Sequence, residues 1–435
     1  MAHAGTVVIL AAGQGTRMKS SRPKVLHPVC GRPMLSYVLD QARALGAERI
    51  LVVVGEGADE VERLVREDED TRGIAFVHQG EQLGTGHALQ MCLPELESAP
   101  GPVIVLYGDM PLLTEASLEA LCAAQVAAGA ALLTAKPARP RGFGRIVRGP
   151  LGTEPIRAIV EEQDASEEQL AIREVNVGVY AFAKEDLINL LPRLANDNAQ
   201  GEYYLTDIVS LLLDEGREVV TVLLEDERDA IGINTIAHLS EARAAMQERI
   251  LEEHMAAGVY VEDPATTYVD YGVRIGAGTR ILPCTVIRAG VEIGAGCEVG
   301  PFTHLRVGTV LADGAEVGNF TEAKQARLGS GTKAKHLAYL GDVEIGSKTN
   351  IGAGTIVANY DGKTKHKTHI GDRAFIGSGT VLIAPTRVGD GALTGGGAVV
   401  TRGSEIPSGD VWVGVPARPI AERKAKSKEE SQGGK

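Results

Sequence analysis

The sequence predicts two folds in one chain: an α/β domain with a mostly parallel sheet, followed by a parallel β-helix of hexapeptide repeats. Short apolar runs alternate with helical patterns through the first half, which is typical of a sheet covered on both faces. Apolar residues then recur every six positions in the second half. Glycine accounts for 53 of 435 residues and aromatic residues for only 4%, which favours a glycine-rich repeat over disorder.

The α/β domain is predicted from three apolar runs, TVVIL, ILVVVG and PVIVLY, which have the composition of buried parallel strands. The helical patterns MLSYVLDQARALG and LTEASLEALCAAQVAAG lie between and after them. Ligands bind such sheets beyond the carboxyl ends of the strands. The loop that follows TVVIL lies at such an end and is therefore a candidate binding site.

The hexapeptide repeat is predicted from apolar residues that stay in phase over many turns. Each short strand buries one aliphatic side chain, and the next coil stacks on it. The phase is lost after Val317 and again after Val357. A regular coil gives no reason for these interruptions, so we expect loops to leave the coil at the two breaks. Loops on a rigid scaffold commonly carry chemistry. The positions in phase are Ile275, Ile281, Ile287, Ile293, Val299, Leu305, Leu311 and Val317, then Ile345, Ile351 and Val357, then Ile370, Ile376, Leu382 and Val388.

Four segments are expected along the chain: a first domain over residues 1–228, a linking helix over 229–256, a β-helix over 257–420 and a disordered tail over 421–435. The linking helix rests on the helical spacing of Leu239, Ala242, Met246 and Ile250. An ordinary helix of the first domain fits this spacing equally well. The tail is expected to be disordered because it is polar and charged throughout.

Charge and cysteine content limit the classes of partner. The net charge is −13, which argues against a nucleic acid, since its binding depends on Lys and Arg contacts to phosphates. The five cysteines form no CxxC pair and are expected to be reduced thiols of a cytoplasmic protein. We expect no membrane partner and no secretory signal, because no apolar run approaches about 20 residues and the first residues lack a basic stretch.

The loop LAAGQGTRM is compatible with phosphate binding but does not match the common phosphate loops. It lacks the GxxxxGK[ST] pattern, and the third glycine of the dinucleotide fingerprint is replaced by Met18. Gly13 and Gly15 would still allow backbone N–H groups to approach a phosphate. A solvated turn explains the loop equally well on its own.

LAAGQGTRM followed by PKVLH resembles the sugar-1-phosphate nucleotidylyltransferases. QGEQLGTGHA, LYGDMPLL, GFGRIVR, IVEEQDA, EVNVGVY and IGINT follow in order. With the hexapeptide half, residues 5–420 resemble one family of bifunctional bacterial enzymes, with glucosamine-1-phosphate N-acetyltransferase and N-acetylglucosamine-1-phosphate uridylyltransferase activities. The resemblance implies a Rossmann-like nucleotidyltransferase domain and a left-handed β-helix. It also implies UDP-N-acetylglucosamine synthesis, which feeds peptidoglycan and lipopolysaccharide precursors.

The resemblance implies a uridylyltransferase site in the first domain. Gly13, Gly15 and Arg17 would face the triphosphate of UTP, and Lys24 would offset charge at the α-phosphate. Such transfer requires charge stabilisation and in-line positioning rather than a side-chain nucleophile. Gln79, Gly84 and Thr85 would contact the uracil, and Gly142, Glu161 and Asn176 the amino sugar. The full implied set is Leu10, Ala11, Ala12, Gly13, Gly15, Arg17, Lys24, Gln79, Gly84, Thr85, Tyr107, Gly108, Asp109, Gly142, Glu161, Asn176 and Asn234.

A magnesium site is expected beside that loop. Asp109 ends the run VIVLYGD, where open sheets place ligands, and a carboxylate suits the hard ion Mg²⁺. The resemblance implies Asn234 as the second ligand. Helix capping is the alternative role of each residue, and it is stronger for Asn234, which precedes a helical pattern.

The resemblance implies an acetyltransferase site at the breaks of the repeat. His336 would take a proton from the sugar amine as the amine attacks acetyl-CoA, since its reference pKa of about 6.5 suits a general base. A loop histidine without a role is the alternative. The sugar phosphate would be held by Arg306, Lys324, Tyr339 and Asn350, with Asn359 and Tyr360 completing the pocket on its acetyl-CoA side. Ala353, Ser378 and Gly396 would lie along the coenzyme A path.

Two positions depart from the family pattern. Alanine is common in the family where this chain has Gly396, and an arginine is usual where WVGVPARP has Gly414. Arg418 is a candidate replacement for that arginine. The resemblance further implies a homotrimer in which neighbouring subunits share each acetyl-transfer site.

Two other functions remain compatible with the sequence. One is a single-activity sugar-1-phosphate nucleotidylyltransferase whose β-helix only assembles subunits, against which the polar residues of the repeat breaks argue. The other is a non-catalytic regulatory subunit, against which the intact Lys24 and Asp109 argue.

Overall fold

The computed structural model describes residues 5–149, 152 and 154–420 and divides into two compact units, Met1–Ala245 and Met246–Lys435. The predicted tail over 421–435 lies outside the described residues. The positions 228 and 256 predicted for the ends of the first domain and linking helix remain predictions. Within the described helices, none is both long and apolar enough to cross a membrane.

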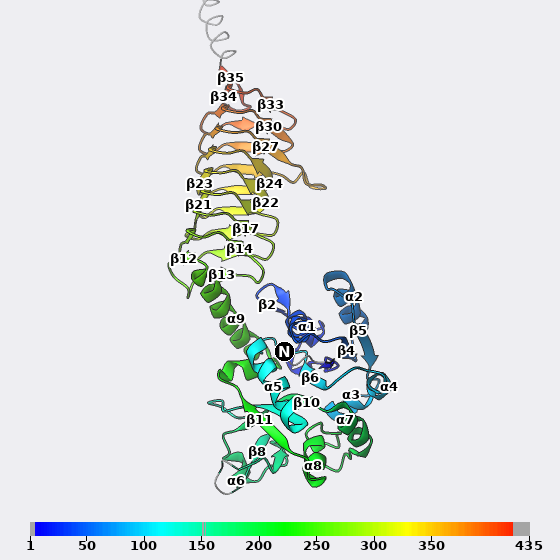
Figure 1. The fold of residues 1–435 in the computed structure, drawn as a ribbon. Coiled ribbons are helices and arrows are strands. Elements are labelled where there is room, and N and C mark those ends of the chain that lie inside the picture. Colours follow the sequence, from blue (N-terminus) through cyan, green and yellow to red (C-terminus); the bar gives the residue numbers. More distant parts are fainter. Residues whose placement is uncertain (1–4, 150–151, 153, 421–435) are drawn as a thin grey trace, which may run out of the picture. The chain divides into compact units, whose positions relative to one another are not determined.

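The first unit is built on one mixed, mostly parallel sheet (Figure 1), as predicted. Seven strands follow the order β11-β7-β10-β6-β1-β4-β5, and only β10 runs antiparallel to its neighbours β6 and β7 along this path. The sheet strands are β1 (Thr6–Leu10), β4 (Arg49–Val54), β5 (Ile74–His78), β6 (Val103–Tyr107), β7 (Ala130–Ala135), β8 (Arg145–Val147), β9 (Ala158–Val160), β10 (Val175–Phe182) and β11 (Val219–Leu223). A separate pair joins β2 (Pro28–Val29) to β3 (Arg32–Pro33).

Helices follow the strands as the apolar spacing predicts. The strands β1 and β7 are buried along their whole length, and α1 buries most of its side chains. The helices are α1 (Met34–Ala44), α2 (Ala58–Asp68), α3 (Thr85–Gln90), α4 (Leu93–Glu97), α5 (Glu115–Ala128), α6 (Glu167–Leu170), α7 (Lys184–Leu190) and α8 (Asp207–Asp214), with short 3₁₀ turns at Thr16–Met18, Lys24–Leu26, Leu191–Arg193 and Glu227–Ala230.

The predicted helix between the two folds is α9 (Ile236–Ala256). Its first half belongs to the first unit, where Arg243 donates two hydrogen bonds to the carbonyl of Pro28, at 3.0 and 2.8 Å. Its second half belongs to the second unit, where Gln247 exchanges hydrogen bonds with the backbone of Val269.

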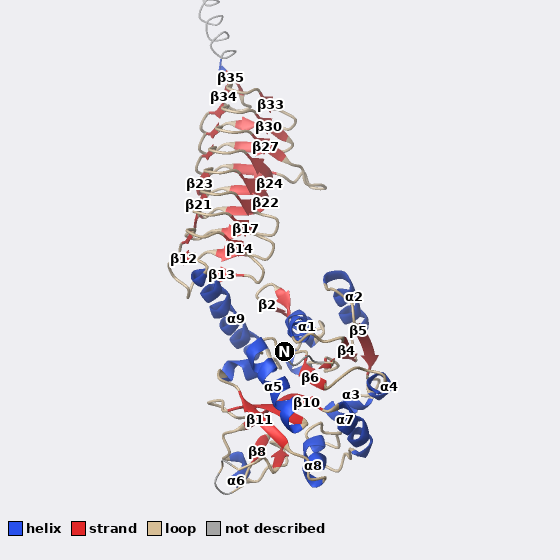
Figure 2. Ribbon diagram, viewed as in Figure 1, coloured by secondary structure: helices blue, strands red, loops and turns tan. Residues whose placement is uncertain are grey.

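The second unit is a β-helix whose short strands stack in parallel (Figure 2). One regular coil leads from Val299 to its register partner Val317 in the coil that follows. One column of strands is β12 (Tyr260–Val261), β15 (Arg280–Ile281), β18 (Glu298–Val299), β21 (Glu316–Asn319), β23 (Lys333–His336), β25 (Asn350–Ile351), β28 (Phe375–Ile376), β31 (Leu393–Thr394) and β34 (Val411–Val413), to which β35 (Arg418–Pro419) pairs.

Two further columns complete the coils. The second contains β13 (Tyr268–Val269), β16 (Val286–Ile287), β19 (His304–Leu305), β22 (Glu322–Leu328), β24 (Tyr339–Ile345), β26 (Ile356–Ala358), β29 (Val381–Ile383) and β32 (Val399–Val400). The third contains β14 (Arg274–Ile275), β17 (Glu292–Ile293), β20 (Val310–Leu311), β27 (Thr368–Ile370), β30 (Thr386–Val388) and β33 (Glu405–Ile406), and it runs through the second halves of β22 and β24.

The prediction of a loop at the first break of the repeat is wrong. The coil continues there but is slightly shorter, because Val317 pairs with Ala334, whereas the preceding coil spans Val299 to Val317. Alanines replace branched side chains at buried inward positions, namely Ala323, Ala326 and Ala334. The six-residue apolar pattern therefore disappears from the sequence while the stacking persists.

The expected loop at the second break is confirmed. Val357 pairs with Leu382, so the chain between these partners is much longer than in a regular coil. The added residues leave the stack after β26 and return to it before β27.

The alanines of the short coil predict a sensitivity to added volume. Ala334 is 0% exposed, so Ala334→Leu should overpack the coil and destabilise folding by about 1–3 kcal/mol. Thermal or denaturant unfolding of the full chain measures this change. Ala295→Leu, at an exposed corner, is the matched control and should leave unfolding nearly unchanged. Equal stability of the two variants would show that the short coil is not tightly packed.

Candidate functional site

A cavity of about 260 Å³ lies where β1 and β6 end in the first unit. Leu10 and Tyr107 are register partners at the ends of these strands, so the segments that follow them begin side by side. The cavity is lined by ten of the predicted residues, Leu10, Ala11, Ala12, Gly13, Lys24, Gln79, Gly84, Thr85, Tyr107 and Asp109, together with Val25, Gln82, Ala88 and Glu202.

Lys24 joins the acidic and amide groups of this cavity. Its ammonium lies 2.5 Å from Oδ2 of Asp109 and 3.1 Å from Oδ1 of Asn234. Arg17 donates to the same Asn234 oxygen over 3.1 Å. Gly15 has φ of +64°, and a Cβ there would lie 2.7 Å from Cβ of Lys24, so glycine allows the loop to fold back against Lys24.

The donor set of Asp109 and Asn234 fits a magnesium ion. Two hard oxygen ligands already converge on one cation, the ammonium of Lys24. No group of three or more His, Cys, Asp or Glu side chains suited to a metal occurs among the described residues. Magnesium fits such a sparse site, because it commonly takes one or two protein oxygens and completes its octahedron with phosphates and water.

Gln79 lies at another wall of the cavity and is only 5% exposed. Its Nε2 donates to the carbonyl of Gly84 over 3.1 Å and lies 3.1 Å from Nδ1 of His87. These contacts occupy the nitrogen of the amide and leave its oxygen to accept a hydrogen bond from a ligand. Gly84 has φ of +105°, and a Cβ there would lie 2.6 Å from the carbonyl oxygen of Tyr203.

The sequence analysis missed Gln82 and His87, both within the quoted run QGEQLGTGHA. Gln82 donates to the carbonyl of Ala12 over 2.6 Å and so ties this run to the loop after β1. Only their positions inside this motif could have indicated that they belong to the site.

The three residues expected to contact an amino sugar lie apart from the first cavity's lining. Glu161 lines a separate cavity of about 320 Å³ and accepts a hydrogen bond from Thr206 over 3.3 Å. Burial raises the pKa of Glu161.

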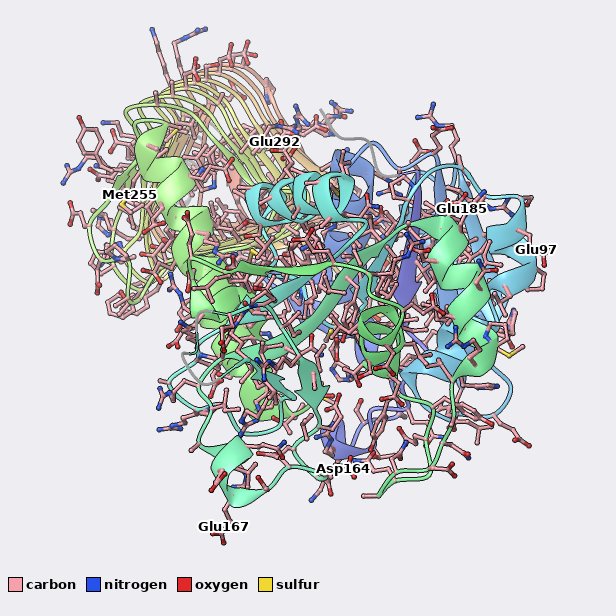
Figure 3. The ribbon with its side chains drawn as sticks, turned by 60° about the horizontal axis from the view of Figure 1, so that its bottom comes forward. Glu97, Asp164, Glu167, Glu185, Met255 and Glu292 are labelled. Atoms are coloured by element: carbon pink, nitrogen blue, oxygen red, sulfur yellow. The ribbon has the colours of Figure 1, made fainter. Side chains whose placement is uncertain are left out.

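Asn176 is buried and donates a hydrogen bond to the hydroxyl of Tyr180 over 2.7 Å. Gly142 is exposed, and its N–H donates to Glu162 over 2.8 Å. Asp164, which also lines the second cavity, is labelled at the surface in Figure 3.

Tyr107 lies in the first cavity, within electrostatic range of Glu161 in the second. It lines the first one, and burial raises its pKa above the usual range. Glu161, from the second cavity, and Asp109, from the first, both lie near enough to raise it further. A Cβ on Gly178, near Asn176, would lie 3.0 Å from the Tyr107 ring, so this glycine gives the ring its space.

The predicted coenzyme residues of the second unit form one column at a corner of the coil. The backbone N–H groups of Gly354, Gly379 and Gly397 donate to the backbone carbonyls of His336, Ala353 and Ser378, over 3.4, 2.7 and 2.8 Å. His336, Ala353, Ser378 and Gly396 therefore stack in succession. The His336 ring is exposed and forms no side-chain hydrogen bond within the described residues.

Gly414 continues this column, because the register that pairs Thr394 with Trp412 places it beside Gly396. Its φ is +91°. The nearest cation along the sequence is Arg418, which pairs across β34 and β35 with Val413 and is exposed. The backbone of Arg418 therefore lies one strand away from Gly414, the position at which the family usually has an arginine.

A second cluster lies at the neighbouring corner, over Gly341. Lys324 is the register partner of Gly341. A Cβ on Gly341 would lie 2.7 Å from Nδ2 of Asn359 and 2.8 Å from the hydroxyl of Tyr339, so glycine is required for these side chains to meet there. Asn359 in turn donates to Asp342.

Three cations, Lys324, Lys365 and Arg306, gather in this cluster beside the carboxylates of Glu322 and Asp342. Lys365 lies beside Lys324 and is the largest cause of the lowered pKa of Lys324, and Arg306 adds to the effect. Arg306 also donates to Glu322 over 2.6 Å. Lysine and arginine side chains that converge in this way form a candidate binding site for an anion such as a phosphate. The sequence analysis missed Lys365, because it is one of three lysines in the run DGKTKHKT and nothing in that run distinguishes it.

Two predicted residues lie outside the cluster over Gly341. Asn350 lies on β25, in another column of strands, between Lys333 and Phe375. Tyr360 is 59% exposed at the start of the loop that follows β26, and its hydroxyl donates to the carbonyl of Gly362.

Two family descriptions match the two halves of the chain. "MobA-like NTP transferase domain" matches residues 7–209, and "Bacterial transferase hexapeptide (six repeats)" matches 272–307 and 367–402. Proteins named "Bifunctional protein GlmU" match nearly the whole chain. The one from Shouchella clausii is 43% identical over 88% of this chain and 90% of its own length. The chain belongs to the GlmU family.

Other GlmU proteins match to a similar extent. Those of Brevibacillus brevis and Trichlorobacter lovleyi are 42% and 44% identical over 88% of this chain and over 89% and 90% of their own lengths. A solved structure of "UDP-glucose pyrophosphorylase complexed with UDP-glucose" covers 57% of this chain and 99% of its own at 18% identity, with a TM-score of 0.46. GlmU family membership makes this chain a transferase with two separate domains, and the expected left-handed β-helix is confirmed.

The contact of Lys24 with both candidate metal ligands predicts a competition. In the absence of nucleotide, Lys24→Gln should strengthen Mn²⁺ binding about tenfold or more, because it frees both oxygens and removes a positive charge within contact distance. Titration of Mn²⁺ followed by electron paramagnetic resonance measures the dissociation constant.

The matched control is Arg17→Gln, which removes a nearby positive charge but leaves the contact of Lys24 with Asp109 intact. Its effect should be much smaller. Equal effects of the two variants would mean that general charge, rather than occupation of the ligands by Lys24, governs metal affinity.

Proposed function

We propose that this chain acetylates glucosamine-1-phosphate with acetyl-CoA in its β-helix and transfers a uridylyl group from UTP to N-acetylglucosamine-1-phosphate in its first domain. The observation that carries the proposal is the presence of two separate sites with different chemistry. One combines a glycine loop, a lysine and a carboxylate, and the other combines an exposed histidine with an anion-binding cluster. Relatives named "bifunctional" support it.

In uridylyl transfer, a phosphate oxygen of the sugar phosphate attacks the α-phosphorus of UTP, and pyrophosphate leaves. Lys24 turns from Asp109 to the α-phosphate and offsets the charge that builds there. The free amide oxygen of Gln79 accepts from the imide N–H of uracil. Asp109 and Asn234 would hold Mg²⁺, which supplies charge neutralisation on the phosphates when it is bound.

In acetyl transfer, the amine of glucosamine-1-phosphate attacks the thioester carbonyl, a C–N bond forms, and the C–S bond breaks to release coenzyme A. His336 takes the proton that the amine loses. Lys324, Lys365 and Arg306 hold the sugar phosphate, and Tyr339 and Asn359 meet beside them over Gly341. The column below His336 carries the coenzyme.

A homotrimer is part of the proposal. Asn350 pairs with Lys333, at the opposite end of β23 from His336, and lies on a different column of strands from Lys324 and Tyr339. A second copy can therefore bring it to a substrate more readily than its own chain can. Most homo-oligomers have closed symmetry, in which every subunit makes the same contacts with its neighbours. A cytoplasmic location also belongs to the proposal, since all five cysteines are free thiols, which reducing compartments preserve.

A single-activity nucleotidylyltransferase with a purely structural β-helix is the second candidate. A structural coil does not require the cationic cluster of Lys324, Lys365 and Arg306, which repel one another. The loop that carries Lys365 likewise has no role in coil stacking. These features favour the bifunctional proposal.

Asp109→Ala should abolish uridylyl transfer and leave acetyl transfer nearly intact, because the residue lies in only one of the two sites. Pyrophosphate release and free thiol formation measure the two activities on the same sample. Asp186→Ala, which removes an ion pair with Arg217 in the same unit, should leave both activities unchanged. Full Mg²⁺-dependent uridylyl transfer by Asp109→Ala would refute the metal assignment.

His336→Ala should lower kcat of acetyl transfer by about 10²–10⁴-fold and spare uridylyl transfer, because general base catalysis acts in the transition state. His369→Ala, which removes a histidine on β27, is the control. The melting temperature of both variants should match that of the wild type. Unchanged acetyl transfer in His336→Ala would remove the support for the second site and leave the proposal with uridylyl transfer alone.

A further inference from the structure

The loop after β26 is a small hairpin that leaves the coil. The register partners on either side of it are further apart in the sequence than those of a regular coil. Tyr360 and Lys365 form an antiparallel bridge, and the N–H of His366 donates to the carbonyl of Asn359 over 2.8 Å. The hairpin therefore has a defined shape of its own and projects Lys365 from its returning strand.

Asp361 is the centre of this hairpin. Its carboxylate accepts from the backbone N–H groups of Lys363 and Thr364, over 2.9 and 2.8 Å, and lies 2.7 Å from Nε2 of His366. The hydrogen bond from the Thr364 N–H is the largest cause of the lowered pKa of Asp361, and the hydrogen bond with the His366 ring is the next. The carboxylate thus stays charged and fixes both arms of the hairpin.

Arg402 reaches the hairpin from another part of the coil. It follows β32, which lies two strands beyond β26 in the order β26-β29-β32. Its guanidinium nitrogen lies 2.9 Å from Nε2 of His366 and 3.4 Å from Oδ2 of Asp361. These contacts connect the hairpin to the rigid stack at a point far from Asp361 in the sequence.

The hairpin needs such a connection because it carries an unfavourable charge contact. Lys365 lies beside Lys324 and is the largest cause of the lowered pKa of Lys324, which the carboxylate of Asp342 only partly offsets. Arg306 adds a third positive charge to the same place. Without a bound anion, this repulsion favours displacement of Lys365 and its hairpin from the coil, so a contact elsewhere must offset it.

We propose that Arg402 is a positioning residue for acetyl transfer: through its ion pair with Asp361 it holds the hairpin against this repulsion, so that Lys365 is in place when the sugar phosphate binds. The inference rests on the proposed acetyltransferase function. Arg402 is not among the residues assigned to either substrate. A binding group that is already in place avoids the entropic cost of ordering the loop when the ligand binds. If the hairpin is in place for only a fraction of the time, the apparent affinity for the ligand falls by that fraction.

The kinetic test compares Arg402→Ala with the wild-type full chain. If the hairpin is in place about one tenth of the time without Arg402, the KM for glucosamine-1-phosphate rises about tenfold, while kcat changes little. Arg402→Lys should recover part of this loss, because it keeps the positive charge beside Asp361. Arg387→Ala removes an exposed arginine of β30 and is the matched control, with unchanged KM.

A second readout does not depend on activity. The hairpin contains three trypsin sites, Lys363, Lys365 and Lys367, and a loop that opens more often is cleaved faster. Limited trypsin digestion, with fragments identified by mass spectrometry, should show faster cleavage at these sites in Arg402→Ala than in Arg387→Ala. Added inorganic phosphate should slow it, because the anion screens Lys324 from Lys365.

The two readouts separate failure of the inference from failure of the proposed function. Wild-type protein without acetyl transfer would refute the function, and the digestion would still test the contact of Arg402 with the hairpin. Equal cleavage rates and equal KM values for Arg402→Ala and Arg387→Ala would overturn the inference. A fall in melting temperature and in both activities would also overturn it, because it would assign Arg402 a role in stability alone.

Discussion

Parallel backbone pairing brings the ends of neighbouring strands to one edge, and both candidate sites lie along such edges. In the first unit, β1 and β6 end in register at Leu10 and Tyr107, so the glycine loop and Asp109 emerge beside each other. In the second unit, the same kind of pairing repeats with each coil. His336 therefore lies at the head of a column formed by Ala353, Ser378 and Gly396.

Much of this arrangement was predictable, because buried apolar side chains follow the period of the backbone. Three strands of the first sheet, β1, β4 and β6, and the inward residues of the regular coils were found from their apolar residues alone. The coil around Ala334 was not, since alanine at inward positions keeps the stacking but removes the pattern that reveals it. The motif residues Lys24, Asp109 and Gln79 were placed in one site through the family resemblance rather than through any period.

Contacts between side chains far apart in the sequence were not predictable. Nothing in the sequence indicates that Lys24 would join Asp109 to Asn234, or that Arg402 would reach Asp361. Lys365 is one lysine among three neighbours, and only its place beside Lys324 distinguishes it. The chain is strongly acidic overall, with a net charge of −13, yet both sites gather positive groups. Local convergence of charge, rather than net charge, determines which ligands each site can hold.

The central claim is that one chain carries two different group transfers that act in sequence on one sugar. The most direct measurement is mass spectrometry of the products formed by the purified full chain from glucosamine-1-phosphate, acetyl-CoA, UTP and Mg²⁺. The account predicts UDP-N-acetylglucosamine, with one coenzyme A and one pyrophosphate released per product. Formation of UDP-glucosamine without release of coenzyme A would contradict it, because the β-helix would then take no part in the chemistry.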